Sequence, residues 1–127
     1  MINKVLTKKQ IEDLATEIFN WLVDHKMWVD VHIYFNGKCW GTDNEDNTEF
    51  CYNENRYFEY EAEPTDYFEY VREPNILSMS FEGDLYDVLN GYAYGWGKLS
   101  DEFRMIFEKY GLYFERGNAW NLTCYEL

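Results

Sequence analysis

The hydrophobic pattern of the chain changes period abruptly after its first helix, and this change limits the folds that it can adopt. Thr7 and Gln10 have the spacing of a capping box, which predicts a helix that starts there and runs to about His25 or Lys26. One face of this helix is apolar: Ile11, Leu14, Ala15, Ile18 and Leu22. Apolar and polar residues then alternate over 29–35, which is typical of a half-buried strand. We therefore expect a helix followed by a sheet.

Turn residues extend this expectation to the whole chain. Asn36-Gly37 favours a type I′ hairpin turn, because both of its positions require positive φ. Further strands are expected at 50–52, 56–63, 67–73 (as an edge strand) and 77–81. Two short helices are expected, one with Asp84 as N-cap and one over 100–110, before a hairpin of 112–116 and 119–125 about Gly117-Asn118. The predicted fold is α+β: one domain of residues 1–127 with the N-terminal helix packed on a curved antiparallel sheet, two short helices and a C-terminal hairpin.

A short unit of aromatic rings and carboxylates occurs twice. The sequence of 57–60, YFEY followed by Glu63-Pro64, returns at 67–70 followed by Glu73-Pro74. The surrounding segment is strongly acidic, with only Arg56 and Arg72 as cations against these carboxylates: Asp43, Glu45, Asp46, Glu49, Glu54, Glu59, Glu61, Glu63, Asp66, Glu69 and Glu73. The whole chain has a formal charge of −13. Such a field repels nucleic acid and anionic membranes and attracts basic partners.

The parity of the strand predicted over 56–63 places Glu59, Glu61 and Glu63 on one outward face. Alternate residues of a strand are about 6.8 Å apart, a spacing on the scale of successive phosphates in a nucleic acid strand. Outward rings at Tyr57 and Tyr67 would stack on arginine. The candidate partner-binding residues are Asp43, Glu45, Asp46, Tyr57, Glu59, Glu61, Glu63, Asp66, Tyr67, Glu69 and Glu73. The alternative interpretation is a polar outer face whose charge keeps an aromatic-rich domain soluble.

Cysteine usage and the N-terminus indicate the compartment. Cys39, Cys51 and Cys124 are odd in number and widely spaced, which fits a reducing cytoplasm better than a disulfide framework. The first ten residues contain no apolar stretch of the kind found in signal peptides, and no segment approaches a membrane span. We therefore expect a cytoplasmic protein.

No motif for catalysis or metal binding is apparent. Asp43, Glu45, Asn47, Glu49 and Glu54 follow the ligand spacing of an EF-hand loop, but Thr48 stands where that loop needs glycine and strands are expected on both sides. The two histidines, His25 and His32, are better explained as structural, as are the carboxylates Asp84 and Asp87. The sequence predicts no cofactor, no metal and no catalytic residue.

At the level of class, the acidic and aromatic segment from Asp43 to Pro74 resembles the small acidic inhibitors of phages and mobile elements, the anti-CRISPR and antirestriction proteins. That resemblance implies a protein that occupies the cationic DNA groove of a host defence nuclease and competes with target DNA. It implies no turnover and no cofactor. Two alternatives stay open: an acidic interaction module for a basic partner that is not a nuclease, and a small metal-binding protein or enzyme.

Overall fold

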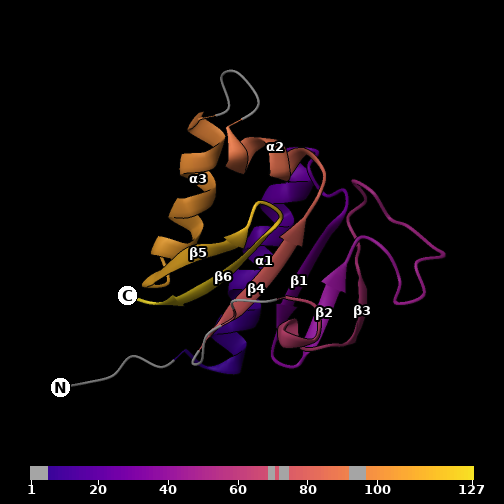
Figure 1. Cartoon of the computed structure of the whole chain (residues 1–127), viewed down its shortest axis with the longest axis horizontal. Coiled ribbons are helices and arrows are strands. Elements are labelled where there is room, and N and C mark those ends of the chain that lie inside the picture. The colour runs from indigo at the N-terminus through magenta and orange to yellow at the C-terminus, as the bar shows by residue number, and fades with distance from the viewer. Residues whose placement is uncertain (1–5, 69–70, 72–74, 92–96) are drawn as a thin grey trace.

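The computed structural model describes residues 6–68, 71, 75–91 and 97–127 and has the predicted α+β architecture (Figure 1). Its elements are α1 (Lys8–Asp24), β1 (Val31–Phe35), β2 (Lys38–Gly41), β3 (Phe58–Glu61), the 3₁₀ turn η1 (Pro64–Asp66), β4 (Leu77–Phe81), α2 (Asp84–Asn90), α3 (Gly97–Glu108), β5 (Leu112–Asn118) and β6 (Asn121–Glu126). The strands form one six-stranded sheet in the order β3-β2-β1-β4-β6-β5, with every neighbouring pair antiparallel. None of the described helices is long and apolar enough to cross a membrane.

The local signals at the N-terminal end are confirmed. The Thr7 hydroxyl accepts a hydrogen bond from the Gln10 N–H at 3.1 Å, and the Gln10 side chain accepts one from the Thr7 N–H at 2.8 Å. Between β1 and β2, Asn36 and Gly37 have φ values of 51° and 78°, as a type I′ turn requires. Near the other end of the chain, Gly111 has a φ of 73° and follows the end of α3, where the left-handed conformation favours glycine.

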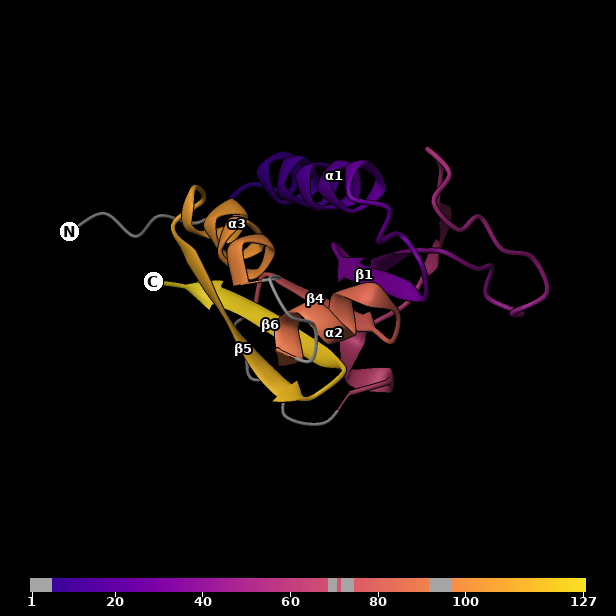
Figure 2. The same cartoon turned by 90° about the horizontal axis from the view of Figure 1, so that it is seen from above.

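Alternation along the strands gives the sheet two different faces. The helix face is covered by α1 and α3 (Figure 2) and carries apolar residues, such as Ile33 of β1 and Met79 of β4, that are fully buried. The largest fully buried side chains on or beside it include Trp28, Phe103 and Phe107. This face holds the main hydrophobic core, whose burial is the chief source of stability.

The second face is covered by the segment that follows β3, which turns through η1 and passes on the side opposite the helices (Figure 2). A smaller cluster of buried residues lies here: Tyr34, Cys39 and Phe68. Partly buried residues pack around it, namely Tyr60, Ala62, Val71 and Trp120. The same strands therefore contribute to two cores of unequal size.

The described part of the second aromatic unit, Tyr67 and Phe68, lies in no strand, which corrects the strand expected to begin at Tyr67. Phe58 belongs to β3, whereas Tyr67 and Phe68 follow η1 and lie in no strand. The N–H groups of Tyr67 and Phe68 bond the Pro64 carbonyl at 3.0 and 2.9 Å, so they are taken by the turn. The rest of the expected edge strand, at 69–70 and 72–74, lies outside the described residues.

Three smaller expectations are also corrected. The expected strand at 50–52 is reduced to a single bridge between Asp43 and Phe50. Gly83, not Asp84, is the N-cap of α2, and Asp84 is the first helical residue. The C-terminal hairpin turns between Asn118 and Asn121, and the register of β5 against β6 shifts at Gly117, which therefore lies within the strand.

Candidate functional site

A pocket of about 300 Å³ opens on the second face of the sheet, and we call it the second-face pocket. Its deep residues are Tyr34 of β1 and Ser80 of β4, which are 4% and 8% exposed. Tyr67, which is 53% exposed, and Trp120 also line it. Because these residues are far apart in the sequence, only the completed sheet brings them together.

One wall of the pocket is a chain of polar side chains centred on His32. Its Nε2 lies 2.5 Å from Asp43 Oδ1, and its Nδ1 lies 3.3 Å from the Ser80 hydroxyl oxygen. The ring lies against Gly41, where an added Cβ would stand only 2.7 Å from the His32 Cδ2 atom. The glycine therefore makes room for the imidazole, and both ring nitrogens have a partner.

Ser80, His32 and Asp43 form the same sequence of groups as the nucleophile, base and orienting acid of serine hydrolases. The hydroxyl is poorly placed for that chemistry, because the Ser80 side chain is 8% exposed and lies deep in the pocket. The arrangement is better suited to fix one wall of a binding pocket, since the imidazole is held from both sides.

The floor of the pocket is aromatic and uncharged near neutral pH. Burial raises the pKa of Tyr34 and of Tyr60, and the neighbouring Cys39 raises both further. Burial also raises the pKa of the Cys39 thiol, to about 12. All three groups are therefore protonated at pH 7, so the floor offers rings and hydroxyls rather than ions.

The rim of the pocket is acidic. Asp43, Glu45 and Glu82 line it, and among the described residues neither Glu45 nor Glu82 forms an ion pair. No lysine or arginine of the described residues lines this pocket. The combination of aromatic floor and unpaired carboxylates favours a cationic ligand.

The three carboxylates of the predicted ladder, Glu59, Glu61 and Glu63, are all exposed, but they differ in their partners within the chain. Glu59 lies on the helix face, where it accepts a hydrogen bond from Trp40 Nε1 at 2.7 Å and lies 3.5 Å from Lys38 Nζ. The Trp40 bond is the main reason that the pKa of Glu59 is lowered, and Lys38 contributes further. Glu61 is opposite Lys38 across the strands, and neither it nor Glu63 has an ion-pair partner among the described residues. Glu59 is therefore partly neutralised within the fold.

The two candidate tyrosines also have ring partners within the chain. Tyr57 stacks on Trp40 with ring centres 4.1 Å apart and meets Phe19 edge-on at 5.2 Å. It therefore packs at the rim of the helix-face core and stays 36% exposed, so its role as an outward platform remains a prediction. Tyr67 contacts Tyr34 at 5.5 Å and stays 53% exposed at the second-face pocket.

The remaining candidates lie on the protruding loop after β2 and around η1 (Figure 1). The loop is held by Asn44, whose side-chain oxygen accepts hydrogen bonds from the N–H groups of Thr48 and Glu49. Glu45 and Asp46 are exposed on this loop, and Asp66 is exposed in η1. Within the described ranges, no group of histidine, cysteine and acidic residues converges on a metal-sized site. Glu69 and Glu73 lie outside the described residues.

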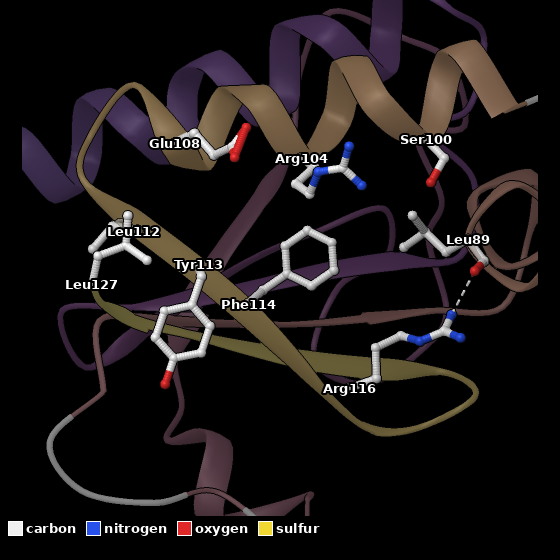
Figure 3. A pocket seen from close by; sticks show the side chains of 9 residues that line it. All are labelled: Leu89, Ser100, Arg104, Glu108, Leu112, Tyr113, Phe114, Arg116 and Leu127. Carbon is white, nitrogen blue, oxygen red and sulfur yellow. Dashed lines mark hydrogen bonds between the residues drawn. The ribbon is translucent and has the colours of Figure 1, made fainter.

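A second pocket, of about 280 Å³, lies between α3 and β5 (Figure 3). Arg104 and Arg116 line it, but both are occupied: Arg104 bonds Asp101 at 2.8 Å, and Arg116 donates to the Leu89 carbonyl at 2.8 Å. Glu108 also lies at this pocket. Both guanidinium groups therefore already have a hydrogen-bond partner within the fold.

Sequence reasoning found the acidic loop but missed the second-face pocket. A usable signal was present in β4, where Ser78 and Ser80 alternate with apolar residues and so predict a polar second face. No family model, curated protein or solved structure matches the chain. The function must therefore be argued from the residues themselves.

Proposed function

We propose that the protein is an acidic inhibitor that mimics nucleic acid, binds the cationic DNA-binding groove of a host defence nuclease and competes with target DNA, as anti-CRISPR proteins of this class do. The observation that supports it is the set of exposed carboxylates without an ion-pair partner among the described residues, on the loop after β2 and around the end of β3: Glu45, Asp46, Glu49, Glu61, Glu63 and Asp66.

The charge distribution supports a basic partner. Between Asp43 and Phe68 the only cation is Arg56, and it pairs with Glu54 at 3.2 Å. The carboxylates in this region therefore repel one another in the free protein, and a cationic groove would relieve that repulsion. Electrostatic attraction would also speed association, and it would weaken as salt is added.

An acidic module for a basic protein other than a nuclease is the second candidate. The second-face pocket favours this second candidate. A pocket of a size to hold one side chain can recognise a protein surface, whether or not that surface binds DNA. The two candidates differ in one respect: DNA must displace the inhibitor from a nuclease groove, whereas it need not affect another partner.

The test is binding of the purified protein to a guide-loaded RNA-guided nuclease, with and without a duplex that carries the short flanking motif, at low and high salt. We expect binding that the duplex displaces and that salt weakens. Binding that the duplex leaves unchanged would reject mimicry, and no binding to such nucleases would favour the second candidate.

A matched pair of variants assigns the binding face. In the first, Glu61→Gln, Glu63→Gln and Asp66→Asn remove three charges near β3; in the second, Asp24→Asn, Glu108→Gln and Glu126→Gln remove three exposed charges elsewhere. We expect the first set to weaken nuclease binding at least about ten-fold and the second to leave it within about two-fold. Equal losses would show that only net charge matters.

A further inference from the structure

We propose that the second-face pocket receives one arginine side chain of the partner protein, with its guanidinium group between the aromatic floor and the rim carboxylates Glu45 and Glu82. This inference rests on the proposed function, because it names the chemical group by which a basic partner is recognised. Glu45 belongs to both sets of carboxylates, but the pocket does not include Glu61, Glu63 or Asp66 near β3.

The size of the pocket suits a single side chain. Its volume of about 300 Å³ lies at the lower end of ligand pockets in proteins, which start near 300 Å³. An adjoining hollow shares Glu82 and Trp120 and adds Tyr86 of α2. The acidic and aromatic surface therefore continues toward α2 and offers room for the residue next to the arginine.

The lining matches the chemistry of a guanidinium group. Tyr34 and Tyr67 lie 5.5 Å apart at an interplanar angle of 36°, and Trp120 adds a further ring to the pocket. A planar guanidinium stacks on such rings and is more weakly hydrated than an ammonium group, so it loses less on entering an aromatic site. The exposed carboxylates of Glu45 and Glu82 supply the compensating charge.

Other charges near the pocket support a cation rather than an anion. Asp43 lies at the pocket wall against His32, and Asp30 is next to β1 with its carboxylate 2.6 Å from the Tyr52 hydroxyl. His32 is the only basic side chain among the described lining residues, and Asp43 and Ser80 hold its two nitrogens. An anionic ligand would therefore meet several carboxylates and no free cation of the described residues.

The test uses two small peptides and the intact protein. Acetyl-Gly-Arg-Gly-amide carries the guanidinium, and acetyl-Gly-citrulline-Gly-amide has nearly the same shape without the charge. The readout is the indole N–H signal of Trp120 in NMR spectra, assigned through a Trp120→Phe variant. We expect the arginine peptide to shift this signal saturably, with a Kd on the order of 1 mM, and the citrulline peptide to bind at least about ten-fold more weakly.

Two variant pairs locate the effect. Glu45→Gln with Glu82→Gln should weaken binding of the arginine peptide roughly ten-fold. Glu108→Gln with Glu126→Gln, at the ends of α3 and β6 and outside the pocket lining, should leave it unchanged. Tyr67→Leu should cause a roughly three-fold loss that Tyr67→Phe restores, because phenylalanine keeps the ring. Because these side chains are exposed, the variants should fold, which circular dichroism checks.

The outcomes separate this inference from the proposed function. Equal binding of both peptides, or no saturable shift of the Trp120 signal, would overturn the arginine pocket even if the nuclease is inhibited. Saturable, charge-dependent binding of the arginine peptide would support the pocket even if no nuclease is bound, and it would then identify the recognition site of another basic partner.

Discussion

The two faces of the sheet use alternate residues of the same strands for different purposes. On the helix face, Ile33 and Met79 lie fully buried in a hydrophobic core that two helices cover. On the second face, His32 and Ser80 occupy the intervening positions and leave a pocket. We infer that burial on the helix face supplies most of the free energy of folding. Polar groups on the second face therefore cost the protein little stability. The predictions below test that division.

The largest expected effect is on the helix face. Phe107 is fully buried and contacts the rings of Phe103 and Phe114 at 5.2 and 5.1 Å. Phe107→Ala should lower the free energy of unfolding by about 3–5 kcal/mol, because it leaves a cavity between rigid elements. Urea denaturation followed by circular dichroism measures it. A loss below about 1 kcal/mol would show that the helix face is not the main source of stability.

The matching change on the second face is Phe68→Ala. Phe68 is also buried and meets Tyr34 edge-on at 5.2 Å. It lies on the single segment that covers the second face, however, and not between helices. That segment can settle into the space, so we expect a smaller loss, about 2 kcal/mol, together with weaker binding of the arginine peptide. If Phe68→Ala destabilises the protein as much as Phe107→Ala, the two faces are energetically equivalent.

Gly41→Ala tests the wall of the second-face pocket. The new Cβ would lie 2.7 Å from His32 Cδ2 and 3.2 Å from the Asp43 carbonyl oxygen, so the imidazole must move. We expect a loss of about 1–2 kcal/mol and a changed His32 signal in NMR spectra. Gly97→Ala at the start of α3 is the control, since no heavy atom of the described residues would lie within 4 Å of its Cβ. Equal effects at both sites would exclude crowding as the cause.

The sequence predicted the elements that local signals specify. The capping box of Thr7, the turn at Asn36-Gly37 and the alternation at 77–81 each depend on a few neighbouring residues, and each is confirmed. The sequence did not predict that Phe68 would leave the sheet, because the hydrogen bonds to Pro64 and the burial against Tyr34 are decided by the completed fold. The pocket was missed for the same reason, since it joins strands distant in sequence.

Alkaline pH should weaken both faces through their buried thiols. Burial raises the pKa of Cys39 on the second face and of Cys124 on the helix face from the ordinary 9.0 to about 12. Below pH 9 both thiols are protonated in the folded and the unfolded chain, so stability is intact. Between pH 9 and 12 only the unfolded chain releases these protons, and stability falls.

Urea denaturation midpoints measured from pH 8 to 11 give the slope of stability against pH. Cys39→Ala and Cys124→Ala should each reduce it. Tyr34 and Tyr60, whose pKa values burial raises, should account for part of the remainder above pH 10. A slope that neither cysteine variant changes would show that these thiols do not differ between the folded and unfolded states.

The smallest expected effects separate carboxylates that stabilise the fold from those left for a partner. Glu59 is held by Trp40 and Lys38 on the helix face, so Glu59→Gln should cost about 0.5–1 kcal/mol at pH 7. Glu82→Gln should change the free energy of unfolding by less than about 0.5 kcal/mol, because among the described residues its carboxylate has no ion-pair partner.

Because the pKa of Glu59 is lowered from 4.5, the contribution of its carboxylate to stability is present above that pH and is lost as the pH falls through the folded value. The two variants should therefore converge once the pH has fallen below the folded value. If Glu82→Gln costs as much as Glu59→Gln at pH 7, the rim carboxylate already serves the fold, and the charge assigned to partner binding would lie elsewhere.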